Sequence, residues 1–150
     1  FNLPERLEAE DIGEDGAKHK PVMMHRAILG SFERFIGILI ENYSGKLPLW
    51  LAPVQLSILT VTEEVNDYAL SLKQKFEEIN LRVELDTRNE KIGYKIREHS
   101  NAKVPLMAVI GKDEVLAESI SIRNLSKNAT NTYSIKEAMS LLKKESEPPR

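Results

Sequence analysis

Hydrophobic and polar positions fall into distinct blocks along the first part of the chain. Residues 1–20 carry six acidic and three basic side chains, with few core-forming ones, which is typical of a solvated loop or hairpin. Residues 21–29, PVMMHRAIL, are apolar except at His25 and Arg26, and such a run predicts a strand buried on both faces. Because side chains alternate along a strand, these two polar residues point to opposite faces.

The spacing of the apolar residues changes to a helical period after residue 30. Apolar side chains recur at this spacing from Phe32 to Tyr43, which indicates a helix with one broad apolar stripe. Ser31 is the expected N-cap of this helix and Gly45 its expected end. The two prolines of the following stretch, KLPLWLAP, mark a boundary between two units that we place near Leu49.

The remaining part of the chain alternates between strand-like and helix-like patterns. We expect strands in QLSILTV, LRVELD, PLMAVIG, EVLAE and SISIRN, and helices in EEVNDYALSLKQKFEEIN and KIGYKIREHSNA. A capping box, Ser134 with Glu137, precedes a last helix. This order predicts an α/β domain with a mostly parallel sheet and an antiparallel edge, and residues 146–150 are expected to be a disordered tail.

Composition and charge narrow the class of protein. The chain has 150 residues, 41% hydrophobic and 29% charged content, and a net charge of −2, so binding of nucleic acid or membrane would need a local patch. It contains no cysteine, which excludes disulfides and fits a reducing compartment. No apolar run is long enough for a membrane span, and the first residues lack a signal-peptide pattern. We therefore expect a cytoplasmic protein without a membrane partner, whose chain continues upstream because the first residue is not methionine.

Two polar residues near the start of the first predicted helix are candidates for chemistry. His25 is either a hydrogen-bonded core histidine or a ligand, and spacing alone leaves both open. Arg34 lies in the first helical turn, where a cation faces the positive end of the helix dipole. A phosphate held by Arg34 and the free backbone amides would relieve this cost; the alternative is a surface ion pair with Glu33 or Glu41.

A second polar cluster follows the strand predicted in LRVELD. Residues 82–103 hold six Lys or Arg against four acidic residues, and the segment RNEKIG leaves the carboxyl end of a strand, where open α/β sheets bind ligands. On composition alone, a solvated helix face is the alternative.

The stretch HRAILGSFERFIGILIENYSGKLPLWLAPVQ closely resembles motif 3 of bacterial threonyl-tRNA synthetases, a class II family, and the residues that follow it. The resemblance extends from FNLPER through RNEKIGYKIREH to the last helix. It implies that residues 1–48 are the C-terminal end of a class II catalytic domain, a strand-helix remnant. It further implies that residues 49–145 form an anticodon-binding domain, a mixed sheet flanked by helices.

This resemblance implies a threonine–tRNA ligase, in which ATP with Mg²⁺ and threonine give threonyl-adenylate before transfer to tRNA(Thr). Arg34 is the expected catalytic clamp on the ATP triphosphate, and Ser31 is placed with it in ATP and substrate binding. His25 is the expected ligand of a Zn²⁺ ion whose other two protein ligands lie upstream. The family is homodimeric. Motifs 1 and 2 of the class II catalytic fold are absent here, so the fragment alone is predicted to be inactive.

The resemblance also assigns residues to the reading of the anticodon. Asn89, Glu114 and Arg123 match the family's base-reading positions. Lys103 stands where the family carries arginine. Lysine keeps the positive charge but lacks the planar guanidinium that can donate two parallel hydrogen bonds, so we predict a phosphate contact there. Expected secondary tRNA contacts are Arg88, Glu90 and Lys91.

Two alternatives to a ligase remain open. A synthetase-derived tRNA-binding or regulatory protein would keep the fold without catalysis, although such a protein has no use for the triphosphate clamp Arg34 or the metal ligand His25. An unrelated α/β module that binds a small molecule would require dismissing the resemblance.

Overall fold

The computed structural model describes residues 3–24 and 26–149. The chain divides into two compact units, residues 1–36 and 37–150. In the described ranges, no helix has both the length and the apolar character needed to cross a membrane. The domain boundary near Leu49 stays a prediction.

The first unit begins with a short helix and a small hairpin. The helix α1 (Leu3–Arg6) precedes β1 (Asp11–Ile12) and β2 (Lys18–His19), which pair antiparallel. Ion pairs on the hairpin, such as Lys18 Nζ to a Glu10 carboxylate oxygen at 2.6 Å, involve exposed side chains. The predicted solvated hairpin is therefore confirmed.

The prediction of a buried strand over residues 21–29 is wrong. The described residues of this segment form no strand, and Val22, Met24 and Ile28 are 76–86% exposed. A strand of this composition needs a ladder partner and a packed layer on each face. Within the described part of the first unit, the strands are the two-residue β1 and β2, which pair with each other, so neither requirement is met.

The predicted helix after Gly30 is confirmed as α2 (Phe32–Asn42). The Ser31 Oγ accepts a hydrogen bond from the Arg34 backbone N–H at 3.2 Å, as expected of an N-cap. Gly45 has φ +74° and its N–H donates to the Ile40 carbonyl at 2.8 Å. The residue before it, Ser44, is also left-handed, with φ +51°, and its N–H donates to the Glu41 carbonyl at 3.1 Å. The two bonds together form the motif that closes the carboxyl end of the helix.

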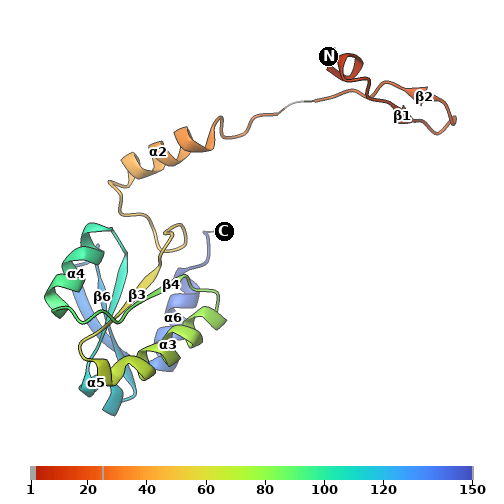
Figure 1. Ribbon diagram of the computed structural model, residues 1–150. Coiled ribbons are helices and arrows are strands. Elements are labelled where there is room, and N and C mark those ends of the chain that lie inside the picture. Colours follow the sequence, from red (N-terminus) through yellow and green to blue (C-terminus); the bar gives the residue numbers. More distant parts are fainter. Residues whose placement is uncertain (1–2, 25, 150) are drawn as a thin grey trace. The chain divides into compact units, whose positions relative to one another are not determined.

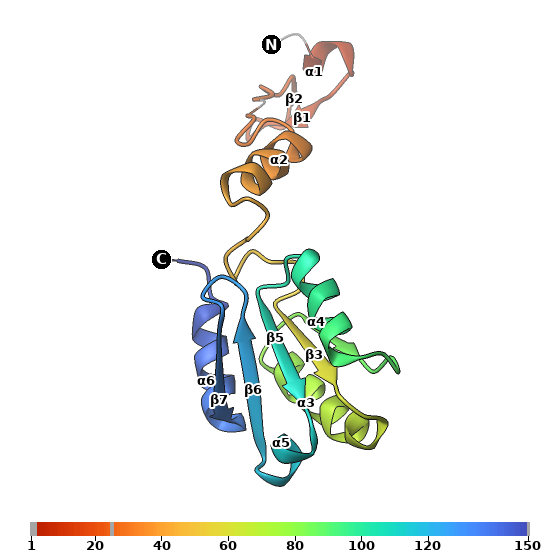
Figure 2. The same ribbon diagram turned by 90° about the vertical axis from the view of Figure 1, so that its left-hand side faces the viewer.

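The second unit is built on a five-stranded mixed sheet with the order β4-β3-β5-β6-β7. The first three strands in that order pair parallel, and β6 pairs antiparallel with both of its neighbours, β5 and β7 (Figure 2). The strands are β3 (Leu56–Thr60), β4 (Val83–Asp86), β5 (Leu106–Ile110), β6 (Ser119–Asn124) and β7 (Ala129–Ser134). The predicted α/β fold with a mixed sheet and an antiparallel edge is confirmed.

Helices flank this sheet. They are the 3₁₀ helix η1 (Glu63–Val65), α3 (Asn66–Glu78), α4 (Ile92–Asn101), α5 (Lys112–Leu116) and α6 (Ile135–Glu145). One side of the sheet packs against α3 and α6 and forms the hydrophobic core (Figure 1). We call this side the closed face; its strand residues are Leu56, Ile58, Leu106, Ala108, Ile110, Ile120 and Ile122. The capping box that starts α6 is confirmed, since the Glu137 N–H donates to Ser134 Oγ and the Ser134 N–H to Glu137 Oε2.

Two local predictions in this unit differ from the structure. EVLAE was expected as a strand but falls largely in the helix α5, where Glu114 accepts the Gly111 N–H at 2.9 Å and so satisfies a free donor at the helix start. One helical turn is too short to show a period. The strand β7 was not predicted, because its half-exposed, polar sequence ATNTYS lacks a regular apolar alternation.

Hydrogen bonds from two side chains fix residues 49–53, which precede β3. The Arg82 guanidinium donates to the carbonyls of Trp50, Ala52 and Pro53 at 2.7–3.1 Å. The buried Gln55 side chain donates to the Leu49 carbonyl and accepts the Arg82 N–H, each at 2.9 Å. Polar backbone groups in residues 49–53 are thus satisfied without regular secondary structure.

Candidate nucleic-acid interface

The side of the sheet opposite the closed face is only partly covered by a helix. Figure 2 shows α4 over β3, with β6 and β7 uncovered on the same side. Strand register aligns Arg123 with Met107 on one side and Thr130 on the other, and Ser121 with Thr132. Because side chains alternate, these residues share the side that bears α4. We call the uncovered part the open face; its residues are Ser121, Arg123, Thr130 and Thr132.

Glu114 and Arg123 provide an acceptor and a donor along the open face. Glu114 Oε1 accepts from Ser121 Oγ at 2.9 Å, which places the carboxylate beside β6 at the end where β5 stops. The Ser121 and Thr132 hydroxyls lie 3.0 Å apart. Further along the same strand, the Arg123 guanidinium donates to Asn128 Oδ1 at 3.0 Å. An ionised carboxylate can accept from base N–H groups, and a guanidinium can donate to base carbonyls or phosphates.

Asn89 and Lys103 lie at opposite ends of α4. Asn89 is exposed and follows the carboxyl end of β4, the same end of the sheet at which Glu114 follows β5. Lys103 is exposed, has φ +61°, and precedes the amino end of β5, the end near which Arg123 pairs with Met107. The four predicted contacts therefore form two pairs, one at each end of the side that bears α4.

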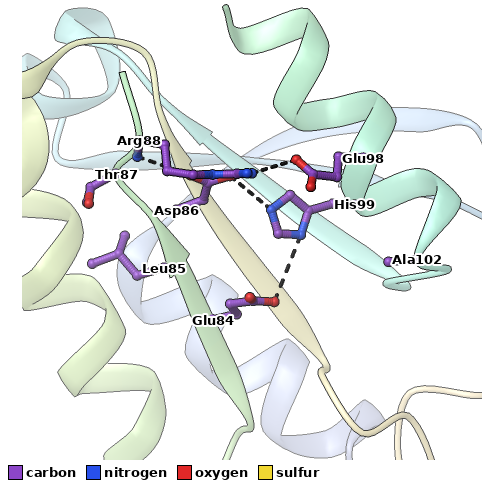
Figure 3. Close-up of a pocket in the computed structure, with 8 residues that line it drawn as sticks. All are labelled: Glu84, Leu85, Asp86, Thr87, Arg88, Glu98, His99 and Ala102. Atoms are coloured by element: carbon purple, nitrogen blue, oxygen red, sulfur yellow. Dashed lines mark hydrogen bonds and ion pairs between the residues drawn. The ribbon is translucent and has the colours of Figure 1, made fainter. Parts of the chain in front are cut away.

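A buried charged network lies under α4, at the end of the sheet that carries Asn89 (Figure 3). Asp86, the last residue of β4, is 6% exposed. Its carboxylate accepts the Arg88 backbone N–H at 3.1 Å and the Arg88 guanidinium at 3.0 and 2.7 Å, and lies 3.1 Å from His99 Nε2. The Arg88 guanidinium is the main cause that holds the pKa of Asp86 well below its usual range, against the opposing effect of burial.

Lys95 and Glu98 on α4 complete the network. Lys95 is 1% exposed; its Nζ donates to the carbonyls of Thr60 and Asp86 at 2.9 and 3.1 Å and lies 3.9 Å from Asp86 Oδ1. The Arg88 guanidinium also reaches Glu98 at 2.6 Å, and its pKa is raised by Asp86 and then by Glu98. A cleft of about 420 Å³ is lined by Asp86, Arg88, Glu98 and His99, among others. These contacts connect α4 to the carboxyl ends of β3 and β4 and to the loop that follows β4.

No role was predicted from the sequence for Asp86, Lys95 or His99. Two signals were available: Lys95 and His99 stand at i, i+4 spacing on one side of the predicted helix, and an aspartate ends a buried strand two residues before an arginine. A buried lysine needs a partner, so this spacing could have indicated the network.

The predicted catalytic residues of the first unit are not assembled into a site. Arg34 is exposed in the first turn of α2, close to its cap Ser31. His25 lies outside the described residues. Across residues 3–24 and 26–149, no three His, Cys, Asp or Glu side chains come together as a metal site, and His19 Nε2 lies 2.9 Å from Asp15. The described residues therefore do not fit a complete Zn²⁺ site.

The chain is similar to proteins of known family. It is 55% identical to the threonine–tRNA ligase of Paracoccus denitrificans (strain Pd 1222), over 99% of this chain and 23% of that protein. It is 61% identical to that of Ehrlichia chaffeensis (strain ATCC CRL-10679 / Arkansas), over 95% of this chain and 22% of the relative. The chain thus spans less than a quarter of the length of these relatives, and the sequence resemblance to threonyl-tRNA synthetases is confirmed.

Solved structures agree on the fold. A crystal structure of the RNA binding domain of threonyl-tRNA synthetase from Cryptosporidium parvum Iowa II matches with a TM-score of 0.77 and 29% identity, over 99% of this chain and 38% of that one. A histidyl-tRNA synthetase from Nostoc sp. PCC 7120 matches with a TM-score of 0.61 and 18% identity, over 75% of this chain and 27% of that one, which supports the fold alone. Residues 55–145, more than half of the chain, match the family model described as an anticodon binding domain, and the chain therefore belongs to the anticodon-binding domain family.

Proposed function

We propose that the chain is part of a threonine–tRNA ligase and that its residues 49–145 bind the anticodon of tRNA(Thr). The observation that carries this proposal is the match of residues 55–145 to the anticodon-binding family, together with 53–61% identity to proteins named threonine–tRNA ligase. The exposed polar row on the open face supports it, because RNA loops expose base edges that polar side chains can discriminate.

In this proposal, Asn89, Glu114 and Arg123 contact bases of the anticodon loop. Glu114 keeps lone pairs free beyond its bonds to Gly111 and Ser121, and the Arg123 guanidinium keeps donors beyond its bond to Asn128. Lys103 contacts a phosphate, which needs charge but no planar fork. The two ends of the side that bears α4 then contact different parts of one loop.

The three residues predicted as secondary contacts, Arg88, Glu90 and Lys91, lie on the same loop as Asn89. Glu90 and Lys91 are exposed, which supports contacts to the RNA. The Arg88 guanidinium already bonds to Asp86 and Glu98, so of these three side chains it is the least available for RNA.

The function of residues 1–48 in this proposal belongs to the whole enzyme, which is cytoplasmic and homodimeric. Arg34 clamps the ATP triphosphate, which binds with Mg²⁺, and Ser31 contributes to ATP and substrate binding. His25 is proposed as one Zn²⁺ ligand, and the ligands that complete the metal site lie outside this segment. The 150-residue chain alone is then predicted to bind tRNA without catalysing aminoacylation.

Filter binding with purified tRNAs tests the proposal. Tighter binding to tRNA with threonine anticodons than to tRNA with other anticodons is expected. Equal affinity for both would contradict anticodon recognition. Separately, a complete chain containing these residues should catalyse threonine-dependent exchange between ATP and pyrophosphate; absence of this exchange would remove the ligase proposal and leave the synthetase-derived binding protein.

A further inference from the structure

The loop that carries Asn89 is a tight turn with few contacts of its own. The Glu90 N–H donates to the Arg88 carbonyl at 2.9 Å, an i to i+2 bond that makes Asn89 the central residue of a three-residue turn. Asn89 is itself exposed. The direction of its side chain therefore depends on where Arg88 is held.

Arg88 is held at its backbone and at its side chain. Its backbone N–H and its guanidinium both donate to Asp86, and the guanidinium also reaches Glu98 on α4. Asp86 is fixed in turn by Lys95, whose buried Nζ bonds the carbonyls that end β3 and β4. Charged hydrogen bonds are stronger than neutral ones and fix side-chain geometry, and the bonds of Lys95 are in addition buried.

We propose that Asp86 and Arg88 are positioning residues that set the discrimination of the anticodon by fixing the Asn89 turn, rather than by touching RNA. This inference rests on the proposed function, because it assumes that Asn89 reads a base. Arg88 then acts inside the protein, in contrast to the direct tRNA contact expected from its position in the sequence.

The opposite charges of the two residues distinguish positioning from direct electrostatic contact. If Arg88 contacted a phosphate, Arg88→Ala would weaken binding of all sequences alike and lower the salt dependence, whereas Asp86→Asn would remove a repulsive charge and strengthen binding. If both residues position the turn, both substitutions lower discrimination in the same direction and leave affinity for mismatched anticodons unchanged.

The experiment measures the dissociation constants of the chain for anticodon stem-loops with a threonine anticodon and with each anticodon base replaced in turn. Arg88→Ala is the principal variant, because the side chain is half exposed and its loss leaves the core intact. Discrimination at the base read by Asn89 should fall at least about fivefold, the lower end of the range for one lost base contact. Arg88→Lys should restore part of it, and Asp86→Asn should act in the same direction as Arg88→Ala.

Asp67→Asn on α3 and Lys136→Ala on α6 are the matched controls, since both residues are exposed on helices that pack against the closed face. A uniform loss of affinity with a lower salt slope in Arg88→Ala, or opposite effects of Asp86→Asn and Arg88→Ala, would overturn the inference. So would unchanged discrimination in both variants while the wild type discriminates.

Amide exchange separates failure of this inference from failure of the proposed function. If the wild type itself shows no discrimination, the proposed function fails. Exchange at the Glu90 N–H, measured without RNA, still reports on the turn: faster exchange at Glu90 in Arg88→Ala, with the centre of β3 unchanged, supports positioning, and unchanged exchange at Glu90 contradicts it.

Discussion

The two sides of the sheet in the second unit are made by the same strands and differ in chemistry. On β6, Ile120 and Ile122 are buried in the core, while Ser121 and Arg123 between and after them lie on the other side. The closed face is aliphatic and packs against α3 and α6. The other side holds a charged network under α4 and the polar open face beside it. Strand alternation thus places the aliphatic core cluster on one side of the sheet and the charged network and polar row on the other.

The largest effect on stability is expected on the closed face. Phe76 of α3 is fully buried in the core, and Phe76→Ala should lower the free energy of unfolding by about 3–5 kcal/mol, through lost transfer energy and a cavity. Tyr94→Ala, at an aromatic residue that is 53% exposed on α4, is the control and should cost about 1 kcal/mol or less. Urea unfolding followed by circular dichroism measures both; equal losses would contradict the assignment of the core to this face.

A somewhat smaller effect is expected in the charged network. Asp86→Asn removes the charge that pairs with Arg88, Lys95 and His99 and should cost about 3 kcal/mol near pH 7, at the low end for a broken buried pair. Asp67→Asn, at an exposed position, should change stability by about 0.5 kcal/mol or less.

The cost of Asp86→Asn should also depend on pH. The pKa of Asp86 is lowered in the folded state, so its contribution is complete above the unfolded carboxyl pKa of about 4 and is lost as the pH falls below that value. The difference in urea midpoint between wild type and Asp86→Asn should therefore shrink on acidification. A difference that stays constant down to about pH 2 would contradict an ionised, paired Asp86.

The sequence was sufficient for elements with a clear period and a local start signal. The helix α2 with its cap Ser31, and α6 with the Ser134–Glu137 box, follow from spacing and capping chemistry. The strand expected over residues 21–29 failed because a buried strand depends on partners that its own sequence does not contain. Short elements such as α5 and β7 were missed because their periods are too brief or too polar to detect.

The candidate site was only partly predictable for the same reason. Asn89, Glu114 and Arg123 came from family resemblance, and the structure brings them to the ends of one side of the sheet. The network of Asp86 and Lys95 joins residues from three elements. The spacing of Lys95 and His99 indicates a shared side of one helix, but the partners of these side chains depend on how the elements pack.

The smallest effect on stability is expected on the open face. Arg123→Ala should cost less than about 1 kcal/mol, since the side chain is half-buried and its hydrogen bond to Asn128 is exposed. Ile122→Ala, one residue away on the closed face, should cost about 2–5 kcal/mol. Paired thermal melts compare the two; similar losses would contradict the separation of the faces.

Anticodon reading by the side that bears α4 is tested most directly by measuring anticodon discrimination in variants from both sides of the sheet. Filter binding of tRNA(Thr) and of a tRNA with another anticodon is compared for Asn89→Ala, Glu114→Ala and Arg123→Ala, with Lys75→Ala and Lys136→Ala from α3 and α6 as controls. Each of the first three variants should lose about 1–3 kcal/mol of discrimination, and the two lysine controls should retain it. Full discrimination in all three variants, or an equal loss in the lysine controls, would contradict the assignment of anticodon reading to the side that bears α4.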